Sequence, residues 1–214
     1  MCRANSILGF LCRFAIVFGL LAVPWPGWPD AYAGCLRKAA TAVFGSFGPK
    51  GVVRFGPIQL SGEKYDTIIL VGNREKLRAP LSGVMAYSRF DSRMLAYFPT
   101  VLVVALILAT GISWRRRLWA LAWGLLWIHL VIALVLWLMI KWIMCVSPGL
   151  GLCEISPFWQ KITLFLFGFL IHSRAWIVVV APIWIAVTFR RSDWIEILGQ
   201  EEAVAGKPAA LSAG

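Results

Sequence analysis

The sequence predicts a mainly helical membrane protein, with four transmembrane helices and a small β-hairpin or antiparallel sheet between the first two. Three observations predict this class. Hydrophobic residues make up 60% of the chain and the mean hydropathy is +0.77, well above the values of ordinary soluble domains. Apolar runs of about 20 residues, the length that crosses a bilayer, recur along the chain. The arginines stand in clusters directly beside those runs, as membrane anchors do.

Four stretches are apolar enough and about long enough to cross the hydrocarbon core of a bilayer. They are residues 7–27, 94–114, 118–140 and 161–189. If both termini are cytoplasmic, the arginine clusters beside these runs all lie inside, as the positive-inside rule requires. The predicted anchors are Arg115, Arg116, Arg117, Arg190 and Arg191. The sequence therefore predicts a multi-pass membrane protein with cytoplasmic termini.

The predicted spans divide the chain into four regions. Residues 1–28 form the N-terminal transmembrane helix, and residues 29–93 lie outside the cytoplasm. Residues 94–189 hold the other three helices, and residues 190–214, rich in Ala and Gly, form a disordered cytoplasmic tail. A cleaved signal sequence is the alternative for the first helix. The Ala-Tyr-Ala at residues 31–33 lies farther from the apolar run than cleavage sites normally do, which favours an uncleaved helix.

The extracytoplasmic region predicts a surface helix followed by strands. Across residues 32–47, apolar side chains recur at helical spacing with basic residues between them, which is typical of a helix lying on a membrane. Residues 52–60 and 65–71 predict two strands joined by a Ser-Gly-Glu-Lys turn, and residues 84–90 predict a third. Because so small a sheet buries little apolar surface, we expect it to rest on the surface helix, the membrane or a partner.

Five cysteines raise the question of a disulfide, a metal site or a nucleophile. Cys145 and Cys153 flank a loop that contains Pro and Gly and can fold back on itself. An oxidising exterior permits a disulfide between them. The chain has no CxxC or Cys-His spacing of the zinc-binding kind, so the sequence predicts no metal site and no cofactor.

His129 stands near the middle of the third predicted span. It shares a helix face with Ala122 and Ala133, and small residues beside a polar one mark helix–helix contacts in lipid. This pattern favours a packing role for the imidazole over a proton relay. A stripe about 120° away is predicted to face lipid or a partner helix. Its members are Trp119, Trp123 and Trp127.

The last apolar run also contains a histidine and an arginine. As a straight helix, residues 161–189 would measure about 43 Å, too long for an upright span. If Arg190 marks the cytoplasmic end, His172 and Arg174 fall near the outer headgroups, and either residues 158–169 form a re-entrant or interfacial segment or the helix is strongly tilted. Side chains two positions apart point to different sides of a helix. Interfacial anchoring is therefore favoured, with partner contact and a chemical site as alternatives.

Residues 94–127 contain Tyr-Phe-Pro-Thr at 97–100 and the run LATGISWRRRLWALAWGLL at 108–126. With these motifs, the segment resembles the small membrane proteins encoded beside exosortases, particularly the exosortase H-associated type. The matching positions are Phe98-Pro99, Ala109-Thr110 and Trp114 to Arg117. The resemblance implies an accessory role in a bacterial inner membrane, beside a transpeptidase that sorts exported, C-terminally tagged proteins. It transfers no catalytic residue.

The favoured function is therefore a non-enzymatic membrane accessory or assembly protein, with membrane lipids and an exosortase-like enzyme as partners. One alternative is a membrane thiol enzyme that uses Cys153 or Cys145 with His172 and Arg174. Another is a small transporter or channel subunit that uses His129. The formal net charge of +11 does not predict nucleic-acid binding, because many of the basic residues lie beside apolar runs rather than in a basic soluble module.

Overall fold

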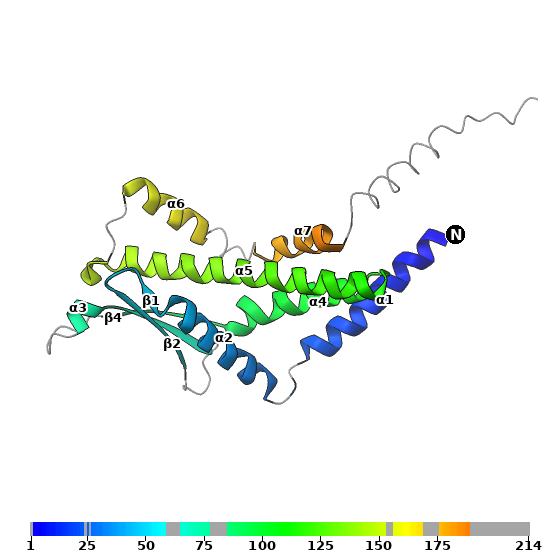
Figure 1. Cartoon of the computed structure of the whole chain (residues 1–214), viewed down its shortest axis with the longest axis horizontal. Helices are drawn as coiled ribbons and strands as arrows, with labels where there is room; N and C mark the ends of the chain where they lie inside the picture. The colour runs from blue at the N-terminus through cyan, green and yellow to red at the C-terminus, as the bar shows by residue number, and fades with distance from the viewer. Residues whose placement is uncertain are drawn as a thin grey trace, which may run out of the picture.

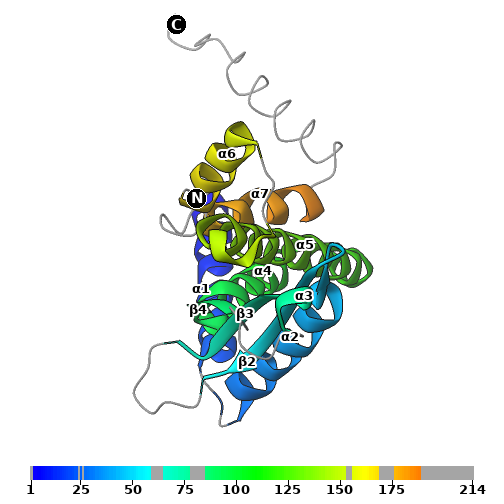
Figure 2. The same cartoon turned by 90° about the vertical axis from the view of Figure 1, so that its left-hand side faces the viewer.

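The longest helix, α5 (Trp114–Val146), is the element along which the others are arranged. The computed structural model describes residues 2–23, 25, 27–58, 65–77, 85–152, 156–168 and 176–188. These parts are mainly helical and contain one four-stranded antiparallel sheet. The sheet, α4, α6 and α7 all contact α5. Figures 1 and 2 show α6 and α7 on one side of α5, with α4, the sheet and α2 on the other.

Helix α5 is longer than the predicted span at residues 118–140, which it contains. Its 33 residues correspond to about 50 Å, against a hydrocarbon core of about 30 Å. It ends at Val146 because Pro148 follows, and a proline disfavours helical backbone at the residue before it. Beyond residue 140, Ile143 and Met144 are buried in the core that α5 shares with the sheet. Tertiary packing therefore explains why the helix continues past the apolar run.

The other apolar helices are shorter. They are α1 (Cys2–Ala22), the π-helix η1 (Arg93–Tyr97) that leads into α4 (Phe98–Ala109), and α7 (Trp176–Thr188). Within the described part of the chain, α5 alone is long and apolar enough to cross a membrane, and the apolar parts of the others fall below about 18 residues. Four full-length spans are therefore not supported.

The fourth predicted span, residues 161–189, contributes to two helices rather than one. Helix α6 (Pro157–Phe167) covers most of residues 158–169, the segment that one of the two predicted alternatives separated from the rest, and α7 follows. Both helices contact α5. The described residues of this run thus belong to two separate elements, α6 and α7.

The predicted strands are present, and a fourth, shorter one was missed. The sheet has the order β1 (Ser46–Phe47), β2 (Gly51–Pro57), β3 (Thr67–Asn73) and β4 (Met85–Phe90). All neighbours are antiparallel, with Val53 opposite Val71 and Val71 opposite Ala86. The two-residue strand β1 is too short to show the alternation of polar and apolar residues that predicts a strand.

One face of the sheet is closed by helices. Alternation along the strands places Val53, Ile69 and Val71 on the same face, and all three are buried. Helix α2 (Trp28–Phe44) contacts β2 and contributes Tyr32, Leu36 and Phe44 to the same core. The sheet was expected to rest on the surface helix, the membrane or a partner, and the structure shows the contact with α2. The position of α2 on a membrane surface stays a prediction.

The end of α1 is held by side chains from η1. Arg93 donates through Nη2 to the carbonyl of Ala22 at 3.3 Å, and the Tyr97 hydroxyl donates to the carbonyl of Leu21. The last carbonyls of a helix have no partner within that helix, so these bonds satisfy groups that would otherwise lack one. Figure 1 shows the start of α1 at the same end of the molecule as the start of α5.

Helices α4 and α5 are in close contact at Gly124. A Cβ atom at this position would stand 2.8 Å from Cδ1 of Ile107 and 3.1 Å from Cγ1 of Val103. The glycine therefore permits a helix contact that a larger residue would push apart. Small residues serve the same purpose where helices pack in membranes.

Replacing Gly124 with Leu is expected to destabilise the protein by about 1–3 kcal/mol, because the added atoms overpack the contact with α4. Gly19→Leu on α1 is the matched control, since nothing lies within 4 Å of a Cβ at Gly19. This control should be neutral or slightly stabilising, because it removes a glycine from a helix. Thermal unfolding of both purified variants in the same detergent measures the difference. Equal behaviour would contradict the assigned α4–α5 packing.

Candidate functional site

A cavity of about 510 Å³ lies where the end of α5 meets the sheet. The β1–β2 turn and the loop after α5 form its walls together with α5 itself, and we call it the sheet-end cavity. It is lined by Phe47, Gly48, Pro49, Lys50, Gly51, Trp137, Lys141, Met144, Gly151 and Leu152. Its volume is within the range of small-molecule sites, about 300–1,000 Å³.

Two glycines give the cavity walls their shape. Gly48 has φ +69° and Gly151 has φ +61°, in the left-handed region that side chains disfavour. Gly48 turns the chain between β1 and β2, and Gly151 turns it after the short 3₁₀ helix η2 (Pro148–Leu150). Both segments thereby reach the same end of α5.

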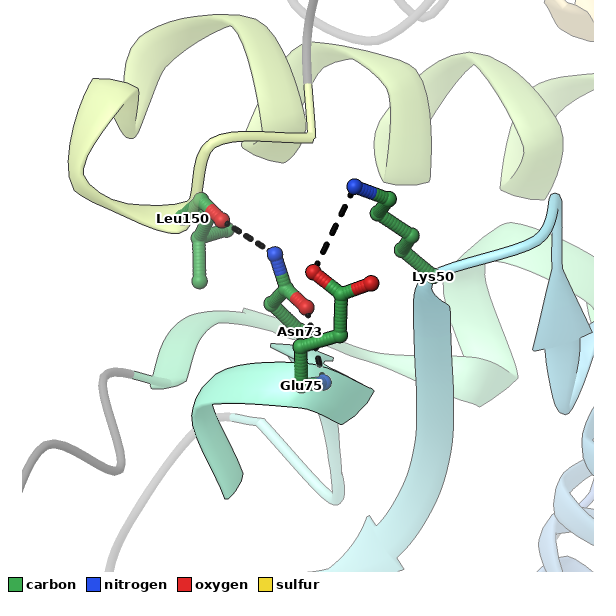
Figure 3. A network of polar contacts seen from close by, with 4 residues as sticks. All are labelled: Lys50, Asn73, Glu75 and Leu150. Carbon is green, nitrogen blue, oxygen red and sulfur yellow. Dashed lines mark hydrogen bonds and ion pairs between the residues drawn. The ribbon is translucent and has the colours of Figure 1, made fainter. Parts of the chain in front are cut away.

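Asn73 ties the loop after α5 to the sheet (Figure 3). It is the last residue of β3 and is 3% exposed. Its Nδ2 donates to the carbonyl of Leu150 at 3.0 Å, and its Oδ1 accepts from the backbone N–H of Glu75 at 2.9 Å. The Lys76 ammonium donates to the carbonyl of Gly149 in the same loop. One buried amide therefore joins two segments that are far apart in the sequence.

The cavity carries an excess of positive charge. Lys50 and Lys141 line it, and Lys76 Nζ lies 3.5 Å from where a Cβ would stand at Gly151. Glu75 pairs with Lys50 at 3.3 Å, but both side chains are more than half exposed, so this pair contributes about 0–1 kcal/mol. Among the described residues at this site, three ammonium groups thus face one carboxylate.

Lys141 differs from the other two lysines in its surroundings. Its Nζ lies 5.2 Å from the ring centre of Phe47 and 5.8 Å from that of Trp137, close enough for cation–π attraction. No ion pair to Lys141 is formed within the described ranges. The site therefore combines cations with apolar walls, an arrangement suited to an anion that carries an apolar group.

The predicted arginine anchors also have a structural role at the opposite end of α5. Arg117 donates through Nη2 to the carbonyls of Thr110, at 3.1 Å, and Ile112, at 3.4 Å, which closes the turn between α4 and α5. Arg116 donates to the carbonyl of Thr188 at the end of α7, at 3.3 Å. Arg115 is exposed. No sequence signal showed these contacts, since donor and acceptor lie on different elements.

The remaining predicted anchors, Arg190 and Arg191, lie outside the described residues. Lipid anchoring by any of the five arginines stays a prediction.

His129 does not pack against a neighbouring helix within the described structure. Its side chain is exposed, and Nδ1 lies 2.7 Å from the carbonyl of Leu125, one turn back in α5. The buried face of α5 contains Gly124 and Ile128 instead. Within the described residues, the neighbouring helices of this chain pack on the other face of α5, and a helix–helix contact through His129 stays a prediction. A contact with lipid or a partner protein stays a prediction.

The predicted thiol constellation is only partly within the described structure. Cys145 is half-buried in the last turn of α5. Cys153, His172 and Arg174 lie outside the described residues, so the disulfide and the thiol-enzyme arrangement stay predictions. Within the described ranges, no three His, Cys, Asp or Glu side chains gather as metal ligands would.

No family model matches this chain, and neither the curated proteins nor the solved structures contain a match. The resemblance to exosortase-associated proteins thus rests on residues 94–127 alone. Function has to be inferred from the fold and from the sheet-end cavity.

Replacing Asn73 with Ala should destabilise the protein by about 1–3 kcal/mol, because it leaves a buried carbonyl and N–H without their partner. Glu75→Gln, which weakens only an exposed ion pair, should cost less than about 1 kcal/mol. Thermal unfolding measures both changes. Hydrogen exchange at residues 149–152 should accelerate in the Asn73 variant alone. A similar small effect of both substitutions would show that Asn73 does not hold the loop.

Proposed function

We propose that the protein is a non-enzymatic membrane accessory protein that holds its sheet at the outer surface of a membrane for a membrane-bound partner. The proposal rests on one observation: α5 has an exposed apolar part and a part that packs against the sheet. Its first part exposes a continuous apolar stripe, and its last turns are buried against the sheet. A helix of this kind crosses the bilayer and also fixes the position of the sheet.

The exposed stripe of α5 supports contact with lipid or a partner helix. Its large apolar members are each at least 48% exposed, and they recur at three- and four-residue spacing along one side of the helix. They are Leu118, Trp119, Trp123, Leu126, Trp127, Leu130 and Leu134. Helix α1 has a similar exposed set: Ile7, Leu8, Leu11, Ile16 and Leu20. Apolar surfaces this large mark contacts with membrane or protein.

Charged residues mark the depth of α5 in the proposed membrane. The cluster from Arg115 to Arg117 precedes residues 118–140, which carry no charge and span about 34 Å, and Lys141 follows. This spacing matches a hydrocarbon core of about 30 Å. The arginines then lie at the cytoplasmic headgroups and Lys141 at the outer ones. The shorter helices α1, α4 and α7 accompany α5 as incomplete spans.

The proposed partner is an exosortase-type transpeptidase, and the resemblance over residues 94–127 supports it. Those residues form η1, α4 and the start of α5, directly beside the exposed stripe. The uncovered face of the sheet offers a second contact surface, with Arg54 exposed on β2 and Tyr87 and Arg89 exposed on β4, on either side of β3. The guanidinium of Arg89 lies 5.6 Å from the ring centre of Tyr87.

Labelling with a membrane-impermeant maleimide tests the proposed topology. We expect Cys35, exposed on α2, to be labelled in intact cells when it is the sole cysteine. Gly111→Cys, in the exposed turn between α4 and α5, should be labelled only after permeabilisation when introduced into a cysteine-free chain. The reverse pattern would invert the orientation, and labelling of both in intact cells would rule out the proposed embedding.

Photo-crosslinking tests the proposed partner. A photoreactive residue at Trp123, in the exposed stripe, or at Tyr87, on the uncovered sheet face, is expected to give an adduct with a co-expressed exosortase-type transpeptidase. Removing the protein should also lower processing of tagged export substrates. The absence of an adduct at either position, with normal processing, would overturn this partnership.

A further inference from the structure

The apolar stripe of α5 leads directly into the sheet-end cavity. At 100° per residue, Leu130, Leu134, Trp137 and Lys141 lie within about 60° of one another on the helix. The first three are at least 38% exposed, and Trp137 and Lys141 also line the cavity. A single surface therefore runs from the lipid-facing part of α5 into a pocket that contains ammonium groups.

The positions of Trp137 and Lys141 agree with the headgroup level of the proposed membrane. Lys141 is the first charged residue after Arg117 in α5, and Trp137 stands one turn before it. Tryptophan and lysine are typical of the membrane–water interface, where an apolar body and a polar group meet different surroundings. The cavity thus opens where phosphate groups of lipids lie.

The cavity walls match the two parts of a lipid. Lys50 and Lys141 line the cavity, Lys76 lies beside Gly151 with its ammonium on the Gly149 carbonyl, and Glu75 offsets part of the positive charge. The apolar part of the wall includes Phe47, Trp137, Met144 and Leu152. A soluble phosphate would use the ammonium groups and leave the apolar wall uncovered. A phosphate attached to an acyl chain would use both.

We propose that the sheet-end cavity binds the phosphate headgroup of an anionic phospholipid, with Lys141 as its main cation and the acyl chains along the stripe toward Leu134 and Leu130. The inference rests on the proposed function, because it requires α5 to cross the membrane. It adds a specific lipid site to the general contact of the helices with lipid. A bound lipid would thereby join α5, the β1–β2 turn and the loop after α5.

Binding of short-chain lipids to the full chain in detergent tests the site. Native mass spectrometry is expected to show tighter binding of dihexanoyl phosphatidylglycerol than of dihexanoyl phosphatidylcholine. Lys141→Gln should weaken binding of the anionic lipid about tenfold, the effect of losing one charge-assisted contact. Lys141→Arg should retain it, because the charge and the cation–π contacts remain possible. Lys38→Gln, which removes an exposed lysine from α2, is the matched control and should change binding less than about twofold.

A second variant keeps the test decisive if Lys141→Gln does not fold. Lys50→Gln alters a side chain that is 55% exposed, and it should also weaken binding of the anionic lipid while leaving thermal unfolding nearly unchanged. Equal binding of the two lipids, or equal loss in Lys50→Gln and Lys38→Gln, would overturn the site. Competition by inorganic phosphate at the same concentration as the short-chain lipid would overturn the lipid as ligand and identify a free phosphate instead.

The two proposals can fail separately. The lipid measurement is made in detergent and does not depend on orientation in the cell. An inverted labelling pattern with preserved binding would reject the topology, whereas correct labelling without lipid preference would reject the site alone.

Discussion

The apolar face of the four-stranded sheet is covered by α5 and α2, and this closure is the constraint on which the rest of the structure depends. The buried face of the sheet carries Val53, Ile69 and Val71, and the sheet has too few residues to cover that face by folding on itself. Ile140, Ile143 and Met144 of α5 belong to the same core. Each apolar side chain removed from water there contributes about 1.5–3 kcal/mol. The helix therefore has to continue past its apolar run, and the loop after it has to end beside the sheet.

The polar groups at the ends of the apolar helices are satisfied from other elements. Arg93 and Tyr97 donate hydrogen bonds to the last carbonyls of α1. Arg117 donates to the carbonyl of Thr110, just after the end of α4. Trp184 of α7 donates to the Thr110 hydroxyl at the same turn, at 3.1 Å. Unpaired carbonyls in an apolar environment cost several kcal/mol each. In the proposed membrane, these contacts would let short helices end without exposing their carbonyls to lipid.

The sheet-end cavity follows from the same arrangement. Because α5 packs on the sheet through its last turns, the segments before β2 and after α5 meet at one place, and Asn73 joins the loop after α5 to the end of β3. Lysines that are distant in the sequence, Lys50, Lys76 and Lys141, are thereby gathered around an apolar wall. The opposite end of α5 gathers arginines for a different purpose, since Arg116 and Arg117 bind backbone carbonyls.

Local patterns in the sequence were sufficient to predict the helical class, the apolar runs and three of the four strands, because the spacing of apolar residues and the turn signals act over a few positions. Tertiary structure decided the extent of α5, the division of residues 161–189 into α6 and α7, and the exposed orientation of His129. It also brought Lys141 together with Phe47, and Arg117 with Thr110. These outcomes depend on which face of each helix meets a neighbour. The face that meets a neighbour is determined by packing between residues far apart in the chain. A periodic pattern within one segment does not predict this long-range packing.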